Sequence, residues 1–172
     1  MTSPDKEFDV RALYDAIDEQ RSARGLSWKE VAAEVSERRT RSRPIALSTI
    51  TGLKERSSGE GDGILQMLVW LRRTPESFTS GAADTRSACF VNPTLSSGEI
   101  LRWDTRALYV AIDARRRERR LTWGETAREL RGFTPGMLTT LAKGGRIHFP
   151  RVMRLVLWLG QPSATFTRVD AW

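Results

Sequence analysis

Residues 9–35 read DVRALYDAIDEQRSARGLSWKEVAAEV, and residues 104–130 read DTRALYVAIDARRRERRLTWGETAREL. Fifteen of these 27 aligned positions are identical, at a constant offset of 95 residues. A second match follows at an offset of 88, where ILQMLVWLRRTPESFT (64–79) aligns with VMRLVLWLGQPSATFT (152–167). Repetition at a fixed spacing is typical of duplicated structural units. The sequence therefore predicts two copies of one small module, here called repeat 1 and repeat 2.

Each repeat begins with a pattern typical of a helix whose first amides are capped by a side chain. Asp9 and Asp104 stand at the expected N-cap, and apolar residues then recur every three or four positions. The second helix of each repeat opens on a capping box, Ser27-x-x-Glu30 and Thr122-x-x-Glu125. In such a box a hydroxyl and a carboxylate satisfy the free amides at the helix start. Two successive helices are therefore expected in each repeat.

A third and a fourth helix are expected to follow. In repeat 2 the third begins at Thr134-Pro135 and stops at Gly144-Gly145, whereas in repeat 1 it starts early, at Pro44. The fourth helix covers about 63–72 and 150–160, and it is apolar on more than one face. One face packs inside its own repeat, and the surplus needs another partner. We expect the two fourth helices to pack on each other, or one of them to pack on another chain.

Because every expected element is a helix, the sequence predicts an all-α protein built from two bundles of four to five short helices. We expect a first domain over residues 1–79, a linker over 80–101 and a second domain over 102–172. The linker stretch consists mainly of small and polar residues, with Pro and Gly among them. Domains this small bury a modest fraction of their surface, so the two repeats are expected to pack on each other.

The charge of the chain points to a polyanionic partner. The formal net charge is +7; residues 1–90 hold 14 Lys+Arg and 14 Asp+Glu, whereas residues 91–172 hold 14 and 7. A basic excess favours polyanions, although solubility with Arg-rich coding bias is an alternative explanation. The single cysteine, Cys89, lies in an apolar stretch and is expected to be inert, and the lack of disulfides suits a cytoplasmic protein. No signal peptide or membrane-spanning run is found, so no membrane partner is expected.

No pattern typical of an enzyme or of a metal site is present in the sequence. His148 is the only histidine and has no accompanying ligand cluster. The acidic stretch Glu60-Gly61-Asp62 lacks the remaining positions of a calcium loop. Neither a Ser/His/Asp or Cys/His arrangement nor a Gly-rich phosphate loop after a strand is found. We therefore expect no enzymatic activity and no cofactor.

The order of the elements resembles the helix-turn-helix domain of the phage Cro/cI repressor family, also called the XRE family. The resemblance covers both repeats, roughly four-fifths of the chain, and it implies two lambda-repressor-like bundles in a phage or bacterial protein. The residues that carry it are, in repeat 2, TWGETA (122–127), Leu130, Gly132-Phe133-Thr134, Leu138, Leu141 and Gly144, and, in repeat 1, SWKEVA (27–32), Val35, Ile50 and Leu53. The sequence departs from the family at Trp28 and Trp123, where Gln is common; we expect both to pack at the helix start.

The resemblance implies double-stranded DNA as the partner, with the third helix in the major groove and the second helix crossing the backbone. The implied base-facing residues are Leu47, Ser48, Thr49, Thr51, Pro135, Gly136, Met137, Thr139 and Thr140. The implied phosphate contacts are Ser27, Lys29, Arg38, Arg39, Arg41, Arg43, Lys54, Arg56, Thr122, Lys143, Arg146, His148 and Arg151. None of the base-facing residues is Arg, Asn or Gln, so each base contact is weak. Either both repeats and the flanking arginines together supply specificity, or one repeat has lost base reading.

The sequence thus favours a sequence-specific transcription regulator, by preference a repressor, located in the cytoplasm and on the nucleoid when bound to DNA. Two non-identical repeats in one chain are expected to read an asymmetric site, so that a monomer suffices, with a homodimer left open. The alternative is a protein-interaction module, such as an antitoxin or anti-repressor, that uses the apolar fourth helices.

Overall fold

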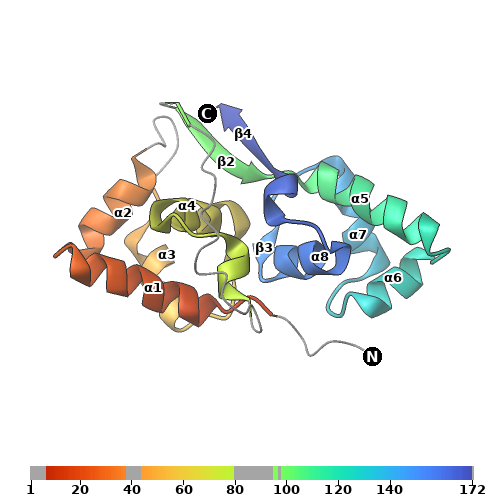
Figure 1. Ribbon diagram of the computed structural model, residues 1–172, viewed down its shortest axis with the longest axis horizontal. Coiled ribbons are helices and arrows are strands. Elements are labelled where there is room, and N and C mark those ends of the chain that lie inside the picture. The colour runs from red at the N-terminus through yellow and green to blue at the C-terminus, as the bar shows by residue number, and fades with distance from the viewer. Residues whose placement is uncertain (1–6, 38–43, 80–94, 97, 172) are drawn as a thin grey trace.

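Each repeat folds into the same run of four α-helices (Figure 1). The structure, a computed structural model, describes residues 7–37, 44–79, 95–96 and 98–171. Repeat 1 contains α1 (Val10–Ala23), α2 (Trp28–Ser36), α3 (Leu47–Thr51) with the 3₁₀ helix η1 (Gly52–Lys54), α4 (Gly61–Leu71) and η2 (Pro75–Phe78). Repeat 2 contains α5 (Thr105–Glu118), α6 (Trp123–Glu129), α7 (Pro135–Thr140) with η4 (Leu141–Lys143), α8 (Arg151–Leu159) and η5 (Ser163–Phe166).

The local signals for the helix starts are confirmed with one exception. Asp9 and Asp104 accept hydrogen bonds from the backbone amides of Ala12 and Ala107, both at 2.9 Å, and both capping boxes are complete. The third helix of repeat 1 was expected to start at Pro44, but α3 begins only at Leu47. Its N-cap residue is Ala46, which has no side-chain acceptor for the free amides of the first turn.

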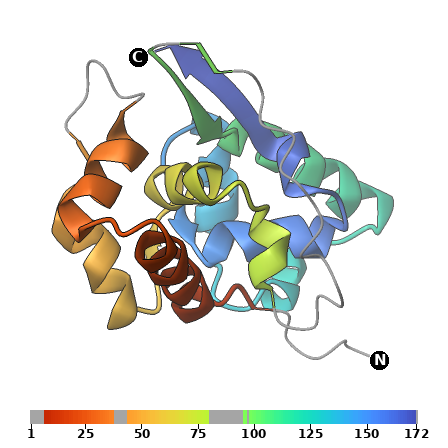
Figure 2. The same cartoon turned by 60° about the vertical axis from the view of Figure 1, so that its left-hand side comes forward.

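The prediction of an all-α fold is wrong, because two small antiparallel sheets are present. Strand β1 (Gly59–Glu60) pairs with β3 (His148–Phe149), and β2 (Glu99–Trp103) pairs with β4 (Thr167–Ala171). The protein is therefore mixed α/β, with 62% of the described residues in helices. The β2–β4 ribbon stands at the upper edge of the molecule in both views (Figures 1 and 2). Strands of two residues are too short to show an alternating pattern, so the sequence did not predict β1 and β3.

Strand β2 begins inside the segment that we expected to be a linker. Residues 99–101 of that segment are hydrogen-bonded to the C-terminal strand β4. Ile100, Leu101 and Trp103 are all buried, so β2 lacks the alternation of a half-exposed strand. Residues 80–94, which include Cys89, lie outside the described part of the chain.

The two repeats are related by an approximate twofold axis, here called the pseudo-twofold axis. A half-turn in the plane of Figure 1 brings α1, α2, α3 and α4 onto α5, α6, α7 and α8. The two repeats also contain equivalent hydrogen bonds within themselves: Asp9 N donates to Phe78 O and Asp104 N donates to Phe166 O, both at 2.7 Å. The two repeats therefore share one fold in which the entry and the exit of each repeat are held side by side.

One apolar core runs through both repeats. Phe149 of repeat 2 is fully buried between Phe8, at 4.6 Å between ring centroids, and Trp103, at 5.6 Å. We expected the surplus apolar face of the fourth helix in repeat 1 to lie against its counterpart, but α4 packs chiefly against β2. The junction between the repeats is thus part of the core and contains strands as well as helices.

Candidate nucleic-acid interface

The capping boxes position α2 and α6 and also occupy two side chains that were expected to contact phosphate. Ser27 Oγ accepts from Glu30 N at 3.3 Å and donates to Glu30 Oε2 at 2.7 Å. Thr122 and Glu125 repeat both contacts at 3.2 and 2.7 Å. Hydrogen bonds from Ser27 and Thr122 hold the pKa of both glutamates below the usual value. The hydroxyl groups of Ser27 and Thr122 therefore donate to carboxylates of their own capping boxes. The cationic side chain at the start of α2 is Lys29, which is exposed.

Trp28 and Trp123 pack at the helix starts, as expected from the sequence. Trp28 stacks on Tyr14 with the ring centroids 5.4 Å apart, and Trp123 stacks on Tyr109 at 5.6 Å. An arginine guanidinium lies 4.8 Å from the Trp28 ring and 4.7 Å from the Trp123 ring. These contacts fix the first helix of each repeat against the second.

The expected base-facing residues of α7 are turned outward from one anchor. Leu138 is fully buried, whereas Pro135, Gly136, Thr139 and Thr140 are exposed and Met137 is half-buried. Thr139 Oγ1 donates to the carbonyl oxygens of Pro135 and Gly136 at 3.2 Å, and Thr140 Oγ1 donates to Gly136 O at 2.7 Å. The hydroxyl protons are engaged within the helix, so the threonines present oxygen lone pairs and methyl groups to a partner.

The corresponding face of α3 is shorter and more apolar. Ile50 is the buried anchor, and Leu47, Ser48, Thr49 and Thr51 lie around it. The side chain of Leu47 is 44% exposed. Only two other large hydrophobic side chains among the described residues are comparably exposed. Thr51 Oγ1 donates to Leu47 O at 3.2 Å, as its counterparts do in α7. An exposed leucine suits contact with a thymine methyl group better than contact with water.

Two adjoining hollows lie beside these helices. The junction groove has a volume of about 920 Å³, and residues of both repeats line it: Glu7, Phe8, Asp9, Val10, Arg11, residues 54–58, His148, Phe149, Pro150, Arg151 and Arg154. The α7 groove has a volume of about 430 Å³, and it is lined by Thr105, Phe133, Thr134, Gly136, Met137, Thr140, Leu141 and residues 144–148 and 151. His148 and Arg151 line both hollows, which therefore form one continuous surface.

This surface gathers most of the expected phosphate contacts that can be placed. Lys54 and Arg56 from repeat 1 and His148 and Arg151 from repeat 2 line the junction groove. Arg146 joins His148 and Arg151 around the α7 groove, whose lining contains no Asp or Glu. The junction groove also includes Glu7, Asp9 and Glu55, whereas the charged side chains that line the α7 groove are all basic. Arg38, Arg39, Arg41 and Arg43 lie outside the described residues.

Sequence reasoning missed the arginines that hold the segments after the third helices. Arg11 Nη1 donates to Lys54 O at 3.2 Å, and Arg106 Nη2 donates to Lys143 O at 3.3 Å. The two arginines occupy equivalent positions in the repeated string RALY, which is the signal that could have identified them. Arg154, which also lines the junction groove, donates to Arg131 O at 3.2 Å and pairs with Glu7.

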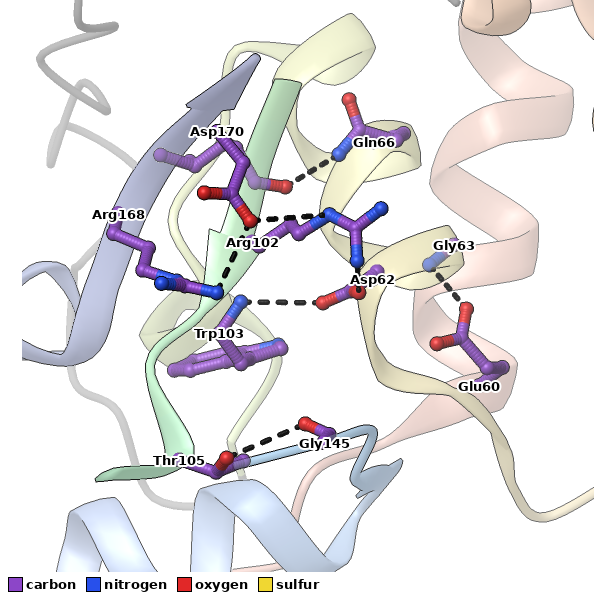
Figure 3. Close-up of polar contacts among 11 residues, drawn as sticks. Glu60, Asp62, Gly63, Gln66, Arg102, Trp103, Thr105, Gly145, Arg168 and Asp170 are labelled. Atoms are coloured by element: carbon purple, nitrogen blue, oxygen red, sulfur yellow. Dashed lines mark hydrogen bonds and ion pairs between the residues drawn. The ribbon is translucent and has the colours of Figure 1, made fainter. Parts of the chain in front are cut away.

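A polar cluster joins the repeats near the start of α4 (Figure 3). Asp62 Oδ1 accepts from Trp103 N at 3.2 Å, and Arg102 lies 3.8 Å from Asp62 and 3.6 Å from Asp170. Gln66 Nε2 donates to the carbonyl oxygen of Leu101 at 2.7 Å. Burial raises the pKa of Asp62 above its usual value, against the hydrogen bond from Trp103. This cluster ties β2 to α4.

No group of three or more His, Cys, Asp or Glu side chains among the described residues is arranged to hold a metal ion. None of the helices in the described ranges has the length and apolar character needed to cross a membrane. No protein-family model, curated protein or solved structure matches the chain.

Proposed function

We propose that the protein binds double-stranded DNA in a sequence-dependent manner through the surface that α3, α7 and the two grooves form. The observation that carries the proposal is the position of Arg146, His148 and Arg151. They surround a hollow without a carboxylate, next to the exposed threonines of α7. A cationic rim beside a protruding helix suits a duplex, whose phosphates flank a groove of base edges.

Affinity and specificity come from different parts of this surface. Lysine and arginine side chains on the rim neutralise phosphates and release counterions, which supplies affinity that falls with salt. Thr139, Thr140 and Met137 offer acceptors and methyl groups to base edges, and such contacts are individually modest. Specificity therefore depends on the sum of contacts from α3 and α7, and not on one strong bidentate pair.

The biological role that fits best is transcription regulation by occupation of a DNA site. A bound chain excludes other proteins from the same stretch of duplex, so repression is the favoured action where the site overlaps a promoter. Selection of bound duplexes from a random pool, followed by titration of an enriched and a scrambled duplex, tests the proposal. We expect the enriched duplex to bind at least tenfold more tightly; equal affinities at every salt concentration count against sequence-dependent binding.

The alternative role as a protein-interaction module started from the apolar surplus of the fourth helices. Every aliphatic side chain and the methionine of α4 are buried, chiefly against β2 and the other helices of repeat 1. The observation that favoured this alternative is thus accounted for by packing within the chain. A stoichiometric protein partner captured by a chain that does not bind DNA is the result that would restore it.

A further inference from the structure

We infer that one chain reads two DNA half-sites in inverted orientation, at one fixed spacing and with unequal strength. This inference rests on the proposed function and specifies the class of duplex that the protein recognises. A tandem duplication leaves the arrangement open, because repeats joined in series can lie head to tail or around a twofold axis. Head-to-tail repeats suit half-sites in the same direction, whereas repeats related by a twofold axis suit inverted half-sites.

The pairing of β1 with β3 distinguishes these arrangements. The two strands are antiparallel, and Glu60 lies opposite His148. These two residues are separated by 88 positions, which is the offset that aligns the second half of the repeats. Gly59 lies opposite Phe149, and Gly61 N donates to Ile147 O at 2.8 Å on the other side of the same pair. Equivalent segments that pair with each other in antiparallel fashion are related by a twofold axis, since a head-to-tail contact joins non-equivalent segments.

The same axis places the two DNA-reading helices on one face. A half-turn about an axis leaves the height along that axis unchanged. In the projection of Figure 1 a half-turn brings α3 onto α7, on opposite sides of the axis. The twofold pairing of β1 with β3 then implies that both helices lie at the same height along the axis. The junction groove connects this region of repeat 1, through residues 54–58, with His148 and Arg151 beside α7. A duplex along this face meets the two helices in opposite directions, as the halves of a quasi-palindrome require.

The spacing is fixed because the repeats share a core. Glu76 of repeat 1 accepts hydrogen bonds from the backbone amide of Ser163 at 2.6 Å and from its hydroxyl at 2.9 Å. Ser163 is 2% exposed, and Phe149 is fully buried between the rings of Phe8 and Trp103. The repeats cannot slide apart without exposing these groups, so the distance between α3 and α7 is not adjustable.

The two halves differ in charge at equivalent positions after the third helix. At the offset of 88, residues 142–151 of repeat 2 align with residues 54–63 of repeat 1. The first stretch holds Lys143, Arg146 and Arg151 and no Asp or Glu, whereas the second holds Lys54 and Arg56 together with Glu55, Glu60 and Asp62. Phosphate contacts are consequently more numerous beside α7. The half-site under α7 contributes more of the affinity than the half-site under α3.

The test uses the full chain and duplexes selected from a random pool. We expect an enriched motif with two unequal halves in inverted orientation and one chain per duplex by mass photometry. Reversing one half-site is expected to weaken binding by roughly 10- to 100-fold, which corresponds to one or two lost base contacts. Inserting about 5 base pairs between the halves should weaken binding because it changes both the rotational phase and the distance. Inserting about 10 base pairs, roughly one helical turn, keeps the phase but lengthens the distance, which repeats at a fixed spacing cannot follow.

Variants at equivalent positions of α7 and α3 show which helix reads which half of the motif. Thr139→Val is expected to change the preferred bases in the stronger half of the motif, and Thr51→Val, at the equivalent position of α3, those in the weaker half. A motif of two half-sites in the same direction, tolerance of the 10-base-pair insertion, or two chains per duplex overturns the inverted single-chain arrangement while DNA recognition itself stands. If no motif is enriched from the pool, the proposed function is contradicted, and this inference fails with it.

Discussion

The indole Nε1 of Trp70 donates a hydrogen bond to Glu34 Oε2 at 2.8 Å, and this contact joins the fourth helix of repeat 1 to its capping-box helix. Arg24 closes the arrangement by donating to both oxygens of Glu34, at 2.6 and 2.8 Å. Repeat 2 contains the same three-residue clamp around Glu129, with Trp158 Nε1 at 2.9 Å. Each clamp holds the second helix of its repeat against the fourth.

The clamps make a pH-dependent contribution to stability. The hydrogen bond from Arg24, followed by that from Trp70, holds the pKa of Glu34 below its ordinary value of 4.5. The stabilisation is therefore present above pH 4.5 and is lost as the pH falls through the lowered pKa. Glu34→Ala is expected to lower the free energy of unfolding at pH 7 by about 1–2 kcal/mol, since the carboxylate is about one-third exposed.

Urea denaturation at pH 7 and pH 3 measures this effect. The exposed Glu19 on α1 provides the control, Glu19→Ala, for which little change is expected at either pH. A loss for Glu34→Ala that is as large at pH 3 as at pH 7 contradicts a role for the charged carboxylate.

The salt dependence of DNA binding reports the cationic rim of the α7 groove. Removing Arg146 and Arg151 together is expected to reduce the slope of log K against log salt by roughly two, because each phosphate contact contributes about 0.9. Fluorescence anisotropy titrations between low and moderate salt give the slope. Arg117→Ala is the matched control, since that side chain is 74% exposed on α5 and lines neither groove. An unchanged slope in the double variant excludes these arginines from the interface.

Base reading by α7 is tested by an isosteric change. Thr139→Val keeps the methyl group and replaces the hydroxyl, whose oxygen is exposed as an acceptor, by a second methyl group. We expect about a tenfold loss on the selected duplex and little change on a scrambled duplex. Thr165→Val, an exposed threonine of η5 outside both grooves, is the control. Equal losses for Thr139→Val on both duplexes mean that α7 contacts only the backbone.

The partly buried carboxyl of Asp62 gives stability the opposite pH dependence. Desolvation raises its pKa above 3.8, with the charge of Glu60 acting in the same direction and Arg102 and Arg146 opposing. The folded state therefore binds this proton more tightly than the unfolded state, and stability falls as the pH rises through the raised pKa. Asp62→Asn keeps an acceptor for Trp103 N and removes the buried charge. The variant should melt at a higher temperature than the native chain at pH 7.

The difference between Asp62→Asn and the native protein should shrink as the pH approaches 3.8, where the native carboxyl is protonated in the fold. Melting temperatures across this range provide the measurement. A difference that does not vary with pH shows that the substitution acts through packing and not through the charge.

Local interactions explain why the sequence predicted so much of each repeat. The capping boxes, the aspartate caps and the glycine stop after α7 depend on residues within a few positions of one another. The same holds for the exposed face of α7, which follows from helical periodicity around Leu138. The duplication itself is visible in the sequence because the two repeats keep the residues that cap and pack their helices.

The tertiary structure alone decided the sheets and the relation between the repeats. The partner of Glu60 in β1 is His148, 88 residues away, and a two-residue strand carries no periodic signal of its own. The composition of residues 80–101 predicts a linker, although residues 99–101 belong to strand β2. Its side chains Ile100, Leu101 and Trp103 are buried together, so no alternating pattern reveals the strand. The shared surface at His148 and Arg151 likewise exists only after repeat 2 packs on repeat 1. Helix capping and helical periodicity depend on residues that are close in sequence, so the sequence predicts them. Strand pairing and the continuity of the grooves depend on contacts between residues that are far apart in sequence.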